Sequence, residues 1–159
     1  MIEIILGLLI VLIVGIPIFI LGFLFHELAH ILEGKRQGST EGVITVHMHE
    51  KKLPSMTVTA NNVKNITHFL WAGGLYTALV FFMLGLFTYL IPSIWAFPLE
   101  FGFTTVALMN LFYAPYEGIL LTKWTHENYL KWHYVMYIIG GLVSIVIHIP
   151  RFIELFNSI

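Results

Sequence analysis

The stretch that decides the fold runs from residue 4 to residue 30, IILGLLIVLIVGIPIFILGFLF followed by HELAH. Its first part, residues 4–25, holds no charged residue and is long enough to cross the hydrocarbon layer of a membrane, which takes about 20 apolar residues. It lacks the basic start of a secretory signal peptide, and its apolar run is too long for one. We therefore expect a retained transmembrane helix that ends in a group of ionisable residues.

Three further apolar runs extend the prediction to a multi-pass integral membrane protein. Hydrophobic residues make up 58% of the chain and charged residues 11%, whereas a typical soluble domain is about 25% charged. We expect an all-α polytopic fold in contact with the lipid bilayer, built as one unit over residues 1–159. The formal net charge of −1 leaves no basic surface for nucleic acid. The predicted spans cover about 4–32, 66–91, 101–122 and 134–150.

The basic residues indicate how these spans are oriented. Of the 8 Lys and Arg residues, only Arg151 falls on the side opposite to the rest. Short cytoplasmic loops carry an excess of Lys and Arg, so we expect a cell-membrane protein with both termini outside and the loop of about 33–65 in the cytoplasm. The outer halves of the spans hold almost no ionisable residues. Of the 9 acidic residues, only Glu27 and Glu117 are predicted well inside spans.

The cytoplasmic loop carries a pattern typical of a β-hairpin. Residues 43–49 (VITVHMH) and 55–60 (SMTVTA) alternate between apolar and polar side chains, and EKKLP supplies a charged turn between them. We expect a small hairpin that caps the helix ends, with His47 and His49 on a solvated face. Three further histidines are expected at the membrane interface, namely His126, His133 and His148.

The motif His26-Glu27-Leu28-Ala29-His30 stands at the inner end of the first span. Side chains at i and i+4 share one helix face, so both imidazoles can reach one metal ion, and Glu27 is placed to hold a water without being a ligand. A bound metal lowers the pKa of water from 15.7 to about 7, and a carboxylate can pass the released proton to a leaving amine. The spacing predicts metal-assisted hydrolysis. The alternative is a set of interfacial polar residues with no metal.

A catalytic zinc site usually has a third protein ligand. Glu117, within APYEG at 114–118, is the one other acid inside a predicted span, and it falls in the inner half, as His26 does. The chain has no cysteine, and a ligand set of nitrogen and oxygen atoms suits zinc. We expect one Zn2+ ion held by His26, His30 and Glu117. The alternative for Glu117 is an acid hydrogen-bonded to tyrosine or to backbone at a broken helix.

Three segments, taken in order, carry a resemblance to a known family. They are FHELAH at 25–30 followed by Gly38, AGGLYT at 72–77, and the stretch from Asn110 through PYEG at 115–118. Together they resemble the site-2 protease family of intramembrane zinc metalloproteases. In that family they correspond to the His-Glu-x-x-His helix, the Gly-rich start of the next span, and an Asn-Pro-Asp-Gly segment whose acid is the third zinc ligand. The resemblance covers most of the chain and implies a small, minimal-core member.

The chain departs from that family at three positions. Glu117 stands where the family has Asp. Its side chain is longer, so its backbone has to lie further from the metal. Thr77 stands where the family has Asn, and Asn110 comes one residue closer to the acid than usual. The resemblance implies substrate contacts for Asn110 and Thr77. Together with His68, which opens the second span near the predicted site, they are our candidate substrate-binding residues.

These residues favour an intramembrane metalloendopeptidase that hydrolyses peptide bonds in transmembrane segments of membrane proteins, with Glu27 as general base and then acid. Its partners would be a membrane-protein or peptide substrate and the bilayer. One alternative is a catalytically inactive metal-binding protein that acts as an interaction or chaperone-like module, for which Glu27→Gln would change nothing. Another is a small metal transporter, which would require polar residues along several spans.

Overall fold

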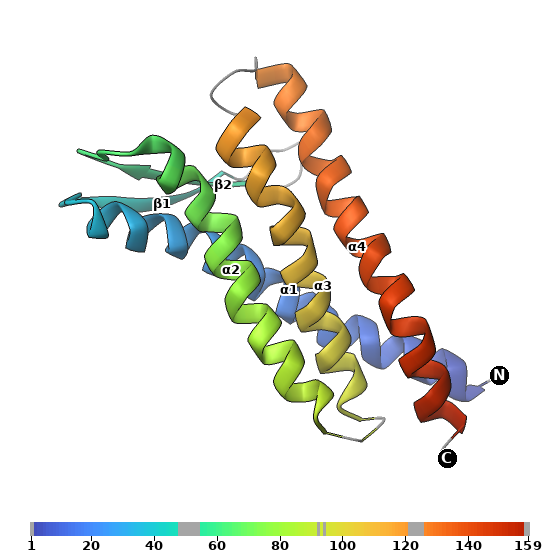
Figure 1. Cartoon of the computed structure of the whole chain (residues 1–159). Helices are drawn as coiled ribbons and strands as arrows, with labels where there is room; N and C mark the ends of the chain where they lie inside the picture. The colour runs from blue at the N-terminus through green and yellow to red at the C-terminus, as the bar shows by residue number, and fades with distance from the viewer. Residues whose placement is uncertain (1, 48–54, 92, 94, 121–125, 158–159) are drawn as a thin grey trace.

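A computed structural model describes residues 2–47, 55–91, 93, 95–120 and 126–157. Within them the chain forms four α-helices, a two-stranded hairpin and a π-helical turn (Figure 1). The first helix crosses the next two obliquely, and the last helix lies along the third, on the side away from the second (Figure 1). The elements are α1 (Ile2–Arg36), β1 (Gly42–His47), β2 (Ser55–Ala60), α2 (Ile66–Tyr89), α3 (Phe97–Pro115), the π-turn η1 (Tyr116–Leu120) and α4 (His126–Asn157).

Three of the helices are long and apolar enough to cross a membrane, over Leu9–Arg36, Ile66–Tyr89 and Tyr134–Leu155. The chain is therefore a multi-pass membrane protein by the length and composition of its helices. The third predicted span is helical as α3, which is long enough with 19 residues but is not apolar enough to be among the three. It contacts α1, α2 and α4, and its polar residues Glu100 and Asn110 are buried between them. A fourth full span remains a prediction.

The predicted hairpin is confirmed within the described residues. β1 pairs antiparallel with β2, so that Gly42 lies opposite Ala60 and His47 opposite Ser55. It packs on the C-terminal part of α1, where a Cβ added to Gly42 would lie 2.9 Å from Ile31 Cγ2. The end of the first predicted strand, residues 48 and 49, lies outside the described residues, and so does the side chain of His47. The solvated face predicted for His47 and His49 therefore stays a prediction.

The C-terminus of α1 is tied to the start of α2. The Gln37 side chain donates from Nε2 to the backbone oxygen of Asn65 (3.1 Å) and accepts from the backbone N–H of Asn65 at Oε1 (2.6 Å). Asn65 is also the N-cap of α2, and its Oδ1 accepts from the backbone N–H of His68 (3.1 Å). Because a cap satisfies a free N–H of the first helical turn, one residue both starts α2 and fixes it to α1.

The first helix continues past the predicted end of its span, because α1 runs to Arg36, and the cytoplasmic position of the loop of about 33–65 stays a prediction. Glu33 is 1% exposed and accepts hydrogen bonds from three side chains. Arg36 binds it through Nε (2.7 Å) and Nη2 (2.8 Å), Gln37 through Nε2 (2.8 Å), and Tyr76 through its hydroxyl (3.0 Å). A carboxylate with this many donors can be buried, so a charge in the sequence did not mark the end of the helix.

The α3 and α4 helices pack closely through small residues. A Cβ added to Gly140 would lie 2.6 Å from the Cα of Met109. One turn further along α4, Ser144 Oγ lies 2.7 Å from Thr105 Oγ1 on α3. Small residues at a spacing of four let membrane helices approach at backbone level, and α4 is thereby held against α3.

A second buried polar group, which we call the Glu100 cluster, consists of Glu100, His148 and Arg151 near the end of the bundle that holds the termini (Figure 1). The Glu100 carboxylate lies 3.5 Å from His148 Nε2 and 3.8 Å from Arg151 Nε, and the Arg151 guanidinium sits 4.8 Å from the centre of the Tyr89 ring. His148 is 5% exposed within the bundle, and the interfacial position predicted for it stays a prediction. Glu100 and Arg151 lie just beyond the bounds predicted for the third and fourth spans, although α3 and α4 extend over both. The side chains of His126 and His133 lie outside the described residues.

Candidate metal centre

His26 and His30 of α1 meet Glu117 of η1 in the interior of the bundle. The two Nε2 atoms are 3.2 Å apart. Glu117 Oε2 lies 3.1 Å from His26 Nε2, and its Oε1 lies 3.3 Å from His30 Nε2. Ligands bound tetrahedrally to zinc at 2.0–2.2 Å are themselves about 3.3–3.5 Å apart. The three side chains therefore already have nearly the spacing that one metal ion would impose, and the group could hold a metal.

The outer nitrogen of each imidazole is held by an acceptor. His30 Nδ1 donates to the backbone oxygen of Phe69 (2.6 Å). His26 Nδ1 donates to Asn110 Oδ1 (2.8 Å), and the orientation of that amide is set by its own Nδ2, which donates to Val106 O (2.9 Å). Each ring thus carries a proton on Nδ1, and in the neutral ring Nε2 keeps its lone pair. Metal-ligating histidines are oriented in this way by an acceptor behind the ring.

The group at the centre consists of acceptors only. The two Nε2 atoms and the Glu117 carboxylate converge, while His26, His30 and Glu117 are 4%, 3% and 7% exposed. Glu117 Oε2 is buried without a hydrogen-bond partner among the described residues. Buried polar atoms normally have partners, and lone pairs facing a carboxylate at about 3 Å repel one another unless a cation lies between them. The residues fit a divalent metal ion.

The local backbone explains why Glu117 reaches the histidines. Pro115 ends the regular helix, because it has no N–H for the α-helical ladder, and η1 follows as one π-helical turn. Such turns occur often at functional sites. Gly118 follows Glu117 and lies directly against the Trp71 indole, in space where a Cβ would clash. The sequence predicted a loosened helix at this point, and the structure confirms it.

Gly73 lets α2 approach the two imidazoles. A Cβ at this position would lie 2.6 Å from His30 Cε1 and 2.7 Å from His26 Nε2. The site is further enclosed by aromatic rings, since the Tyr113 ring centre lies 5.5 Å from that of His26 and the Phe69 ring 5.1 Å from that of His30. The centre is thus enclosed by the backbone and the Phe69 ring of α2 and by the Tyr113 ring of α3.

The other predicted site residues have different positions. Glu27 is half-buried and close enough to His26, His30 and Glu117 to interact with their charges. Thr77 is 1% exposed, and its Oγ1 has no hydrogen-bond partner among the described residues. His68 is exposed and lines a cavity of about 140 Å³ together with Glu33 and Arg36, apart from the three ligands. The substrate contacts predicted for Thr77 and His68 remain predictions.

Asn110 has a role that sequence reasoning missed, as do Phe69 and Gly73. The amide of Asn110 is hydrogen-bonded to His26 and to the backbone oxygen of Val106. It therefore orients His26, one of the three predicted metal ligands. The Gly73-Gly74 pair was the available signal for a close approach of α2. No signal in the sequence pointed to the Phe69 carbonyl, because a backbone acceptor is independent of residue type.

Comparisons of the chain with protein-family models, with curated proteins and with solved structures found no match. The resemblance to the site-2 protease family therefore rests on the three motifs themselves.

Proposed function

We propose that this protein is an intramembrane metalloprotease that hydrolyses peptide bonds in transmembrane segments of other membrane proteins. The observation that carries the proposal is the convergence of three buried acceptors, His26 Nε2, His30 Nε2 and the Glu117 carboxylate, next to a half-buried Glu27. An inactive metal-binding module would need the three ligands but not the neighbouring carboxylate.

The ion in this proposal is zinc. Two imidazole nitrogens and one carboxylate are the ligand set of many catalytic zinc sites, which keep a further position open. Other divalent transition metals also bind ligand sets of nitrogen and oxygen. Metal analysis of the purified protein is therefore needed to identify the ion. When bound, the ion supplies Lewis-acid chemistry, by which a carbonyl is polarised and the pKa of water is lowered to about 7.

The part played by the chain in hydrolysis is to hold and move a proton. Glu27 lies one position after His26, so its carboxylate is beside the ligands and is not one of them. It takes the proton of the water whose oxygen bonds to the scissile carbonyl carbon. It then returns the proton to the amine nitrogen when the carbon–nitrogen bond breaks. Acid and amine are the products, and Glu27 ends in its starting state.

The Glu100 cluster weighs against a metal transporter. A path for divalent cations needs a series of ligands, and within the described residues His26, His30 and Glu117 form the one group of three close ligands. In the other half of the bundle, Glu100 is faced by the Arg151 guanidinium. This positive charge neutralises the carboxylate and repels a second cation.

Metal analysis and cleavage assays on the detergent-purified protein test this function. We expect about one zinc per wild-type chain, and loss of zinc in His26→Ala and Glu117→Ala. Glu27→Gln should keep the zinc and lose cleavage of single-span peptides. Glu41→Gln, which removes an exposed glutamate, is the control and should keep both properties.

The outcomes separate the alternatives. Full zinc in Glu117→Ala would refute the third ligand. Cleavage that persists in Glu27→Gln would refute the mechanism. If Glu27→Gln keeps cellular function as well as zinc, the protein is a metal-binding module and not a protease.

A further inference from the structure

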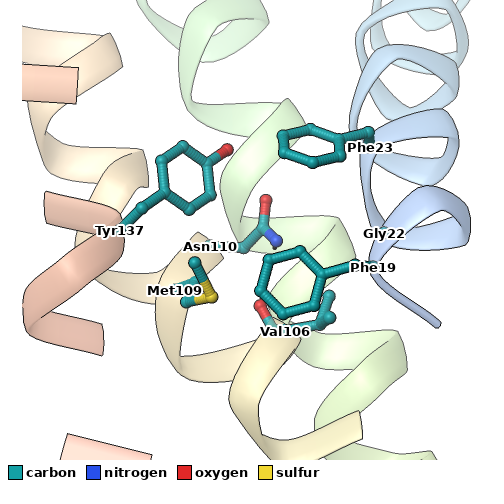
Figure 2. A pocket seen from close by; sticks show the side chains of 7 residues that line it. All are labelled: Phe19, Gly22, Phe23, Val106, Met109, Asn110 and Tyr137. Atoms are coloured by element: carbon teal, nitrogen blue, oxygen red, sulfur yellow. Dashed lines mark hydrogen bonds between the residues drawn. The ribbon is translucent and has the colours of Figure 1, made fainter. Parts of the chain in front are cut away.

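A small cavity lies where α1, α3 and α4 meet. Figure 2 shows its lining, which is formed by Phe19, Gly22 and Phe23 of α1, by Val106, Met109 and Asn110 of α3, and by Tyr137 of α4. Its volume is about 10 Å³, which is near the minimum that holds one water molecule. In this structure it is therefore closed to anything larger.

The cavity borders the metal centre. Asn110 faces it, and the Oδ1 of the same side chain accepts from His26 Nδ1 (2.8 Å). Rings connect the two places as well, because Tyr137 stacks on Tyr113 (4.9 Å between ring centres) and Tyr113 lies 5.5 Å from the His26 ring. A group that entered between α1 and α4 would thus contact Asn110, which orients the predicted metal ligand His26.

The cavity is partly open, and side chains alone join α1 to α4 beside it. No Cα of α1 lies within 8 Å of a Cα of α4 in the part of the chain that the structure describes. The Phe23 and Tyr137 rings, 5.9 Å apart, bridge the two helices. By contrast, α3 and α4 are in close contact. Gly140 packs against the backbone of Met109, and Ser144 is hydrogen-bonded to Thr105. The α1–α4 contact is therefore the one that can open without separating closely packed backbones.

The lining also indicates the kind of occupant. Apart from the Asn110 amide and the Tyr137 hydroxyl, the side chains around the cavity are apolar. Phe23 is 40% exposed on the outer surface of the bundle. In a membrane protein that surface meets lipid, so an apolar segment moving within the bilayer reaches these rings first. An ion or a soluble polar peptide would have no partners there.

We propose that the transmembrane segment of a substrate reaches the metal centre between α1 and α4, through a crevice that the Phe23–Tyr137 ring pair closes. This inference rests on the proposed protease function. The ring pair opens when the two side chains separate, while α4 stays fixed to α3 at Ser144 and at the Glu100 cluster.

Cross-linking across the crevice tests the route, and the chain offers a clean background because it has no cysteine. A disulfide needs Cα atoms less than about 7 Å apart, so the Phe23→Cys/Tyr137→Cys protein is bridged with a longer, reducible bifunctional thiol reagent. The matched control is Thr105→Cys/Ser144→Cys, which is oxidised directly to a disulfide between α3 and α4, because Ser144 is 0% exposed and its Oγ lies 2.7 Å from Thr105 Oγ1. We expect the first bridge to slow cleavage of a single-span peptide at least tenfold, with recovery on reduction and unchanged zinc content. The control bridge should leave the rate unchanged.

A second readout does not depend on catalysis. A photoreactive phenylalanine analogue is placed at Phe23 or at Leu24, whose exposures are similar at 40% and 44% but which point to different sides of α1. Metal-free protein is irradiated with a biotinylated single-span peptide of about 20 apolar residues. We expect at least fivefold more capture at position 23 than at 24.

The results distinguish failure of the route from failure of the function. An unchanged cleavage rate in the protein bridged at 23 and 137 would overturn the proposed route, as would equal capture at 23 and 24. If the protein without cross-linker cleaves no peptide, the proposed protease function is refuted. The ratio of peptide captured at position 23 to that captured at position 24 then decides whether apolar segments enter between α1 and α4.

Discussion

Replacing Gly73 by alanine should abolish metal binding while leaving the helices intact. A Cβ at this position would lie 2.6 Å from His30 Cε1 and 2.7 Å from His26 Nε2. Non-bonded carbon atoms normally stay about 3.5–4.0 Å apart, so the imidazoles would have to retreat by about 1 Å. Metal–ligand distances tolerate changes of only about 0.2 Å. The displacement is several times that tolerance, and we expect zinc affinity to fall by at least about 100-fold, the upper end for loss of a supporting residue.

The matched control is Gly141→Ala on α4, where an added Cβ meets nothing within 4 Å. Alanine in a helix is favoured over glycine by about 0.5–1 kcal/mol, so this variant should keep its zinc and unfold at an equal or higher temperature. Zinc content and competition with a chelator measure the affinity, and circular dichroism of the metal-free proteins checks that both variants are helical.

The reasoning would be refuted by a helical Gly73→Ala protein with wild-type zinc content and the wild-type chelator midpoint. That result would mean that His26 and His30 do not bind the ion from their positions against α2. An equal loss of zinc in Gly141→Ala would show that the effect comes from any added methyl group and not from contact with the ligands.

Three further perturbations test other parts of the structure. Asn110→Ala should weaken zinc binding about 10- to 100-fold, measured by chelator competition, because His26 loses the acceptor of its Nδ1 proton. Zinc affinity should fall as the pH is lowered from about 8 to about 5, because protons then compete for the two Nε2 atoms; an affinity independent of pH would contradict the ligand assignment. Glu100→Leu should reduce the free energy of unfolding by about 1–3 kcal/mol, because it removes the buried carboxylate that faces His148 and the half-buried Arg151. Glu154→Gln, which removes the exposed partner of Arg151, should change it by less than about 0.5 kcal/mol, and denaturant unfolding measures both.

The sequence was enough to predict the parts of the site that depend on local geometry. The spacing of His26 and His30 places them together on any α-helix, and the pattern of residues 43–60 is sufficient for a hairpin. Glu117 was found by elimination, as an acid within an apolar run at matching depth. Its meeting with the histidines depends on the packing of α1 against α3, which η1 continues, and the structure supplies this packing.

What the sequence did not indicate was the burial of charged residues by distant partners. Glu33 and Glu100 were taken to mark span ends, because an isolated charge is costly inside a membrane. Each is buried beside a basic side chain, Arg36 one turn further along the same helix and Arg151 from α4. The bond between Asn110 and His26 joins residues 84 positions apart, and no local pattern encodes it.

The connection between α1 and α2 has a consequence for how this chain can vary. Gln37 and Asn65 close its base, and the paired strands continue the chain to His47 and Ser55. Each doubling of a loop's length costs only about 0.6 kcal/mol of loop-closure free energy. Residues inserted between His47 and Ser55 should therefore lower the stability of the fold only slightly. The helices that carry the metal ligands keep their places, because the Gln37–Asn65 bonds lie on the near side of any insertion. A recognition domain can therefore be grafted there, by evolution or by design, without rebuilding the centre.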